Sequence, residues 1–176
     1  MTALTVSPAA VPALDFDALV AFDLADIAVQ PQGLRITIRR SKTDQGGEGA
    51  VLPVNRTSRP TCPAAAFEAW LAASGIIEGA VFRGVDRHGR LGGRLSGQAV
   101  AVIVQRRATA AAAGLEAPAS YAGHSLRGGF ATSAAQAGLG EIRIARQTRH
   151  ASLGSLRRYV RDGALFAENL AAEIGL

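Results

Sequence analysis

The sequence predicts a mainly α-helical fold with a small antiparallel sheet at one edge. Apolar residues make up 48% of the 176 positions but aromatic residues only 5%, which favours a core of small and branched aliphatic side chains. Several segments repeat apolar residues at three- and four-residue spacing, which is the period of a helix. Residues 33–56 instead alternate apolar and polar residues around a glycine-rich turn, as paired strands do. The length fits a single domain.

The N-terminal part is expected to contain an unstructured lead-in and one short helix. Residues 1–14 carry prolines and small residues without a period, which predicts a poorly ordered segment. Residues 16–27 are expected to form an amphipathic helix. Its apolar stripe consists of Phe16, Leu19, Val20, Leu24 and Ile27.

An antiparallel hairpin is expected over residues 33–56. The apolar side chains of Leu34, Ile36 and Ile38 alternate with polar ones, so one face of the first strand is wet and basic. Pro53 lacks a backbone N–H, and this predicts that the second strand lies at a sheet edge.

The remainder of the chain is expected to be helical, apart from a Gly/Arg-rich loop over residues 83–97. Pro63 suits the first turn of a helix over 63–74. Ser96 is a suitable N-cap for a helix that runs to Ala113. Further helices are expected over 124–137, 140–148, 151–161 and 164–173.

The charge of the chain points to an anionic partner. The net charge is +5, and every basic residue apart from the histidines is arginine except Lys42. A basic surface of this kind is typical of proteins that bind nucleic acid. The lone Cys62 has no partner for an internal disulfide and is expected to be a buried, small apolar residue. Because the sequence lacks an apolar run of membrane-spanning length and a secretory signal pattern, we expect a cytoplasmic location and no membrane partner.

The segment HSLRGGFATSAAQAG carries the first candidate chemistry. His124 and Arg127 lie three residues apart at the start of an expected helix, so they project from nearly the same face. With help from the helix N-terminus, they can converge on one anion. A polar cap on an ordinary helix is the alternative interpretation of this pair.

The segment RHASLGSLRRYVR carries the second. His150 and Tyr159 are nine residues apart and would point to opposite sides of one continuous helix. They can share a site only if the helix breaks between them, and Gly154 offers that break.

Together these residue types suit one reaction. A tyrosine oxygen can attack a phosphodiester and form a covalent phosphotyrosine, which conserves the energy of the bond without a cofactor, metal or ATP. Arginine and imidazole donors are suited to hold the charge of the transition state. An ammonium group on a hairpin can protonate the leaving oxygen, whereas arginine would be a poor acid, and this gives Lys42 a role.

The order of a hairpin lysine, HSLR and TRHASLGSLRRY resembles the catalytic domain of tyrosine recombinases, the phage integrase family. The resemblance covers residues 15–176 and implies a DNA breaking-rejoining fold, with double-stranded DNA as partner and self-association into a tetramer on the DNA. It implies that Tyr159 is the nucleophile that forms a 3′-phosphotyrosyl link, and that Lys42 is the general acid. Arg127 would stabilise the transition state, His124 would serve as acid/base and His150 as a hydrogen-bond donor to the phosphate.

The resemblance extends to two further features. The C-terminal helix over 164–173 is expected to dock on a neighbouring protomer. Some of the arginines are expected to track DNA phosphates: Arg39, Arg40, Arg149, Arg157 and Arg158.

Two departures from the family pattern matter for activity. The family's motif Leu-Arg-x-x-Glu-Leu corresponds here to LDFDAL, so Asp15 stands in place of an arginine and Ala18 in place of the glutamate. An aspartate at that point would repel the phosphate. The family's N-terminal core-binding domain, which clamps DNA, is absent from this sequence.

These departures leave two alternatives to an active recombinase. The chain can be a catalytically inactive integrase remnant that binds DNA or protomers. The motif of Arg87, His88 and Gly89 also matches the short histidine motif of histidine phosphatases, although it falls in the expected glycine-rich loop and not after a first strand.

Overall fold

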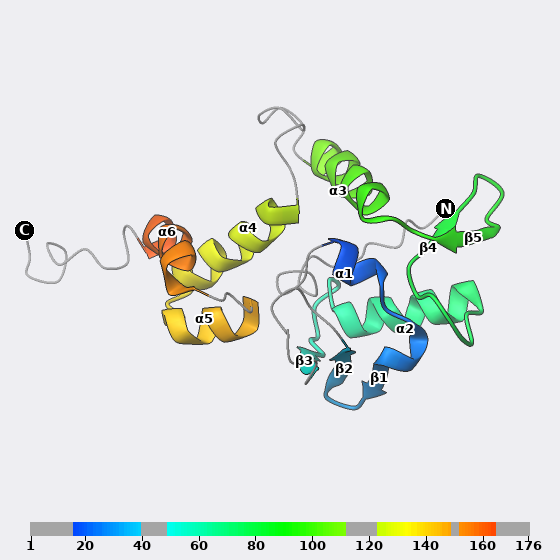
Figure 1. The fold of residues 1–176 in the computed structure, drawn as a ribbon, viewed down its shortest axis with the longest axis horizontal. Coiled ribbons are helices and arrows are strands. Elements are labelled where there is room, and N and C mark those ends of the chain that lie inside the picture. The colour runs from blue at the N-terminus through cyan, green and yellow to red at the C-terminus, as the bar shows by residue number, and fades with distance from the viewer. Residues whose placement is uncertain (1–15, 40–48, 112–122, 149–151, 165–176) are drawn as a thin grey trace, which may run out of the picture.

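The computed structural model describes residues 16–39, 49–111, 123–148 and 152–164. They form two hydrophobic clusters, one around a three-stranded sheet and one among the last three helices. Figure 1 shows these helices grouped at one end of the molecule and a small two-stranded hairpin at the other. The expected lead-in over 1–14 lies outside the described residues. No helix within the described ranges is long and apolar enough to cross a membrane.

The three-stranded sheet confirms the hairpin expected over residues 33–56. Its strands pair antiparallel in the order β1-β2-β3. They are β1 (Ile27–Gln30), β2 (Gly33–Ile38) and β3 (Ala50–Asn55). In the central strand, Ile36 lies opposite Ile27 on one side and Leu52 on the other. Pro53 sits on an edge strand, as its missing N–H predicts.

The segment before the sheet corrects the expectation of one helix over 16–27. Helix α1 (Phe16–Val20) is short, and a 3-10 turn η2 (Leu24–Asp26) leads directly into β1. The guanidinium of Arg94 donates to the carbonyl oxygens of Val20 at 2.6 Å and Phe22 at 3.2 Å. These carbonyls would otherwise accept bonds from a continuing helix, so a residue far along the sequence ends α1.

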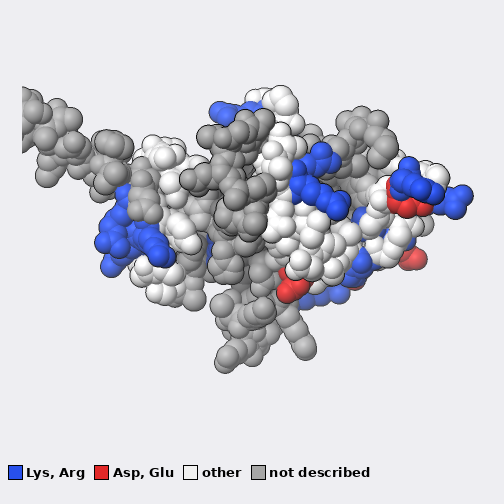
Figure 2. Space-filling model, turned by 90° about the horizontal axis from the view of Figure 1, so that it is seen from above, with Lys and Arg blue, Asp and Glu red and all other residues white. Residues whose placement is uncertain are grey.

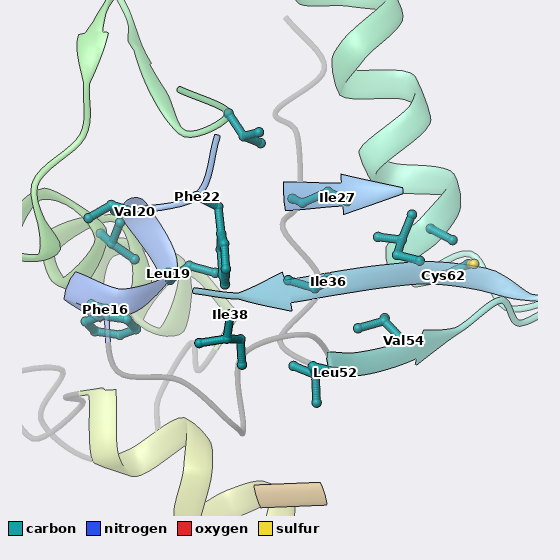
Figure 3. Packing of buried hydrophobic residues seen from close by; sticks show 14 residues of the cluster. Phe16, Leu19, Val20, Phe22, Ile27, Ile36, Ile38, Leu52, Val54 and Cys62 are labelled. Carbon is teal, nitrogen blue, oxygen red and sulfur yellow. The ribbon is translucent and has the colours of Figure 1, made fainter. Parts of the chain in front are cut away.

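Helix α2 (Pro63–Ser74) has the predicted bounds and begins with the predicted proline. The indole N–H of Trp70 donates to the carbonyl oxygen of Val81 at 2.9 Å, which ties the helix to the strand segment that follows. Cys62 precedes α2 and is buried, as predicted. Figure 3 shows Cys62 together with Ile36 and Val54 among the apolar side chains on the sheet.

The Gly/Arg-rich segment expected to be a loop is a two-stranded hairpin instead. Strand β4 (Arg83–Val85) pairs antiparallel with β5 (Leu91–Arg94). A turn at Asp86 holds the two strands together, because its backbone N–H donates to the carbonyl oxygen of Arg90 at 3.0 Å. The glycines and arginines of this segment hide the alternating pattern on which a strand prediction depends.

The helical remainder agrees closely with the prediction. The helices are α3 (Gly97–Ala111), α4 (Gly123–Gln136), α5 (Glu141–Thr148) and α6 (Leu153–Ala164). Ser96 caps α3 as predicted, since its Oγ accepts from the backbone N–H of Ala99 at 3.1 Å. The helix expected over 164–173 lies outside the described residues after Ala164.

Helices α4, α5 and α6 share the second hydrophobic cluster. Leu156 of α6, Ile144 of α5 and Ala131 of α4 are buried at its centre. Helix α4 makes its most extensive contact with α6. Small residues on α4 allow this close approach, and the cluster positions the segment that carries Tyr159.

Candidate active site

Arg127 joins α4 to the end of α5. It lies one turn inside α4, is half-buried, and its Nη2 donates to the carbonyl oxygen of Thr148. Thr148 is fully buried and is the last residue of α5, with its hydroxyl donating to the carbonyl oxygen of Ile144 at 2.7 Å. The guanidinium is therefore anchored two residues before His150 in the chain, which brings two of the predicted motifs together.

Tyr159 lies on α6 and packs against α4. Its ring is half-buried at the border of the second hydrophobic cluster, next to the buried Leu156 and Val160. Since Leu156 precedes Tyr159 by three residues, both lie on the side of α6 that faces α4. The hydrophobic cluster thus fixes the position of the predicted nucleophile.

Gly128 is what allows this arrangement. A Cβ atom at position 128 would lie 2.7 Å from Tyr159 Cε1 and 3.2 Å from Cζ, well inside van der Waals contact. The tyrosine ring therefore rests on the backbone of α4 at the residue next to Arg127. The predicted nucleophile and the predicted transition-state arginine, which are 32 residues apart in the sequence, become neighbours in space.

The other predicted catalytic residues are placed in part. His124 lies in the first turn of α4, three residues before Arg127, while its side chain lies outside the described part. Lys42 and His150 also lie outside the described residues, as does Asp15. The expected break between His150 and Tyr159 is present, because α5 ends at Thr148 and α6 begins at Leu153.

The break is not at Gly154, however. Gly154 is the second residue of α6, and its backbone N–H donates to the hydroxyl of Ser152 at 3.1 Å. A serine side chain thus caps the new helix, and the glycine lies inside it.

A groove connects the sheet to this site. It has a volume of about 470 Å³ and opens between strand β3 and helix α5. Its lining residues are Ala50, Val51, Leu52, Pro53, Arg143, Arg146 and Gln147. Ala50 pairs with Ile38 at the end of the hairpin where the connection that contains Lys42 leaves the sheet. This end of the hairpin therefore lies beside the helix that ends at Thr148.

Comparisons with known proteins agree with this geometry. No family model matches the chain. An integrase/recombinase XerD homolog of Selenomonas ruminantium is 38% identical over 153 residues, which is 86% of this chain. The chain belongs to the tyrosine recombinase family. It covers 44% of the length of that relative.

Solved structures show the same tyrosine recombinase fold. The XerA recombinase matches with a TM-score of 0.66 at 19% identity, over 97% of this chain and 55% of XerA. The XerH site-specific recombinase bound to its difH substrate has a TM-score of 0.63 at 16% identity, over 100% of this chain and 48% of XerH. The integrase of the Tn1549 transposon, in complex with DNA, has a TM-score of 0.62 at 13% identity, over 98% of this chain and 58% of the integrase. The predicted fold class is thereby confirmed.

The arginines predicted to bind DNA in this tyrosine recombinase domain occupy different environments. Arg39 is exposed, but its Nε pairs at 2.5 Å with the buried carboxylate of Asp26. Arg157 is exposed and pairs at 3.3 Å with Glu141. Arg158 is exposed on α6. Arg40 and Arg149 lie outside the described residues, and the role of all five in binding DNA stays a prediction.

Exposed arginines gather on the last two helices of the domain. Figure 2 shows a basic patch at the end of the molecule where α5 and α6 lie. The exposed arginines of these helices are Arg143, Arg146, Arg157, Arg158 and Arg161. A surface of this charge beside Tyr159 can attract a phosphodiester backbone.

The motif of Arg87, His88 and Gly89 lies away from the recombinase site. It forms the exposed tip of the β4–β5 hairpin, at the end of the molecule opposite to α6. Nε of Arg87 donates to Nε2 of His88 at 2.9 Å. This exposed position on a turn gives the histidine phosphatase alternative no structural support.

Sequence reasoning missed two residues that position the site. Gly128 was expected to share a packing role with Gly129, but only Gly128 faces the tyrosine, since a Cβ at Gly129 would meet nothing within 4 Å. Arg94 ends α1 through the carbonyls of Val20 and Phe22 and pairs with Asp23 at 2.5 Å. A glycine beside the motif arginine was the available signal for the first, and the sequence contains none for the second.

Proposed function

We propose that the chain cleaves and rejoins DNA through a covalent link to Tyr159, as part of site-specific recombination or integration. The observation that carries the proposal is the contact of the Tyr159 ring with Gly128, next to the anchored guanidinium of Arg127. A nucleophile and a cation at adjacent positions suit a phosphodiester, whose transition state gains negative charge on its oxygens.

The proposed reaction balances without a further reactant. The Tyr159 oxygen attacks the phosphorus, the bond from phosphorus to the 5′ oxygen breaks, and a 3′-phosphotyrosine forms. His124 accepts the tyrosine proton, and Lys42 donates a proton to the departing 5′ oxygen. Arg127 and His150 hold the non-bridging oxygens. Attack of a 5′ hydroxyl on the phosphotyrosine reverses these steps and rejoins the strand.

DNA is the proposed partner, and the arginines of α5 and α6 are the proposed contact surface. Guanidinium groups donate in pairs to phosphate oxygens, and the patch lies on the helices that hold Tyr159 and Thr148. We further propose self-association on the DNA, with the segment over 164–173 docking on a neighbouring protomer, and a nucleoid-associated location in the cytoplasm.

A nicked suicide duplex tests the proposal. Cleavage beside the nick releases a short fragment, so the covalent complex cannot reverse and migrates as a shifted band on a denaturing gel. Because the target sequence is undefined, the duplexes carry randomised sequence around the nick. We expect a band with the wild-type chain that disappears in Tyr159→Phe. A band that persists in Tyr159→Phe would overturn the proposal.

An inactive DNA-binding remnant is the second candidate, and one observation favours it. Asp15 occupies the position of the family's first arginine, next to α1, whose Ala18 replaces the family's glutamate. Asp15→Arg in the same gel assay separates the candidates. A band that appears only with Asp15→Arg would show a site that lacks one phosphate ligand, and DNA binding without a band in either chain would support the remnant.

A further inference from the structure

The β4–β5 hairpin carries a second concentration of positive charge. Residues 79–111, which contain the hairpin and α3, include six arginines and a single acidic residue, Asp86. Arg87 and Arg90 are exposed at the turn between the two strands. Figure 2 shows basic atoms at this end of the molecule, far from the patch on α5 and α6.

Hydrogen bonds within the turn occupy the carboxylate of Asp86. Its Oδ1 accepts from the backbone N–H of His88 at 2.8 Å and of Arg90 at 2.9 Å. The backbone N–H of Gly89 donates to the carbonyl oxygen of Asp86 at 3.1 Å, and Gly89 adopts a φ of +81° that favours glycine. The acidic group therefore shapes the turn, and the side chains of Arg87 and Arg90 project from a preordered tip.

The base of the hairpin is fixed to the body of the domain. Arg94 bonds to two carbonyls at the end of α1 and to the carboxylate of Asp23. Across the strands, Nε of Arg83 donates to the carbonyl oxygen of Gly92 at 2.7 Å. These two arginines serve the fold, which distinguishes them from Arg87 and Arg90 at the tip.

We propose that the tip of the β4–β5 hairpin binds the phosphate backbone of duplex DNA outside the cleavage site, through Arg87 and Arg90. The inference rests on the proposed function, because it takes DNA as the partner. A duplex that reaches the tip from Tyr159 must extend along the long axis of the molecule, since the two lie toward opposite ends (Figure 1). The hairpin then contacts a flanking segment and contributes to affinity, not to the chemical step.

The physical basis is the low cost of ordering the contact. A preordered turn loses little conformational entropy when it binds, and each arginine that neutralises a phosphate releases condensed counterions. Binding through such contacts weakens as salt increases. The salt dependence therefore reports the number of phosphates that the protein contacts.

The test measures binding of a fluorescent duplex of mixed sequence by anisotropy at several salt concentrations. In Arg87→Ala/Arg90→Ala, the slope of log K against log salt is expected to decrease in magnitude by about two, one for each phosphate that an arginine no longer neutralises. Arg87→Lys/Arg90→Lys retains the charge and should restore most of the slope. Arg35→Ala/Arg59→Ala removes two other exposed arginines and should leave it unchanged.

Each outcome decides one claim. Equal slopes in the wild type and Arg87→Ala/Arg90→Ala would overturn the hairpin proposal while DNA binding stands, and so would an equal decrease in the Arg35→Ala/Arg59→Ala control. If the hairpin variant binds DNA normally but self-associates less, the tip contacts an acidic protein surface instead. Absence of DNA binding by the wild-type chain would overturn the proposed function together with this inference. Covalent adduct formation at saturating DNA should be unchanged in the hairpin variant, because Arg87 and Arg90 lie away from Tyr159.

Discussion

The ring of Tyr159 rests on the backbone of Gly128, where a Cβ atom would approach Tyr159 Cε1 to 2.7 Å. Gly128→Ala should therefore displace the tyrosine from its place beside Arg127. A displacement of about 1 Å can reduce catalysis by about a hundredfold. The rate of covalent complex formation on the suicide duplex measures this effect.

Gly129→Ala is the matched control for that substitution. A Cβ at this neighbouring position of α4 meets nothing within 4 Å, and the residue is exposed. Alanine in place of a helix-interior glycine should raise the free energy of unfolding by about 1 kcal/mol and leave the cleavage rate unchanged. Equal rates in the two variants would show that Gly128 does not position the nucleophile.

Leu156→Ala should weaken the contact between α6 and α4. Leu156 is fully buried in the second hydrophobic cluster, so its truncation should lower the free energy of unfolding by about 2 to 5 kcal/mol. Leu153→Ala on the same helix removes an exposed leucine and should have little effect. Denaturant titrations of both variants measure the difference, and a similar decrease in both would contradict the described packing.

Arg127→Ala should affect stability as well as chemistry. The substitution removes a charge-assisted hydrogen bond to the carbonyl oxygen of Thr148 at the end of α5, which corresponds to about 1.5 to 3 kcal/mol. Arg157→Ala removes an exposed ion pair with Glu141 and should reduce the free energy of unfolding far less. If the two variants unfold at the same denaturant concentration, Arg127 has no structural role between α4 and α5.

The ion pair of Arg56 and Glu68 predicts a dependence of stability on pH. The two side chains form paired hydrogen bonds of 2.9 and 2.6 Å, and the guanidinium lowers the pKa of the Glu68 carboxyl. A carboxylate whose pKa is lower in the folded state stabilises the fold above its unfolded pKa, which is about 4.3 for glutamate. That contribution disappears as the pH falls through the lowered value.

Glu68→Gln should therefore be less stable than the wild type at pH 7, and the difference should shrink below about pH 4.3. Denaturant titrations of both chains at pH 7 and pH 3 measure it. A difference that is the same at both pH values would show that the ionised carboxylate does not stabilise the fold.

Much of the fold is predictable from the sequence because its signals are local. The bounds of α2 follow from Pro63 and the apolar period, and the hairpin of β2 and β3 follows from alternating side chains. The end of α1 was wrong, since it depends on Arg94, which is 74 residues from the Val20 carbonyl that it contacts. The β4–β5 hairpin was missed because hydrogen bonds to Asp86, and not hydrophobic alternation, define its turn.

The candidate site divides in the same way. The motif spacing predicts which residues take part, and the structure confirms that Arg127 and Tyr159 come together. The contact of the ring with Gly128 and the anchor of Arg127 on Thr148 depend on how three helices pack. No local pattern in the sequence encodes such contacts, so they could not be predicted.

The central claim is that Tyr159 forms a covalent bond with DNA, and peptide mapping of the covalent complex tests it most directly. After nuclease and trypsin digestion, mass spectrometry locates the residual nucleotide. Tyr159 falls on the short peptide Tyr-Val-Arg that follows Arg158, whereas Tyr121, the other tyrosine, falls on the long peptide that ends at Arg127. We predict a nucleotide 3′-phosphate on the peptide with Tyr159. A nucleotide on the peptide with Tyr121, or no adduct from either the wild type or Asp15→Arg, would contradict the claim.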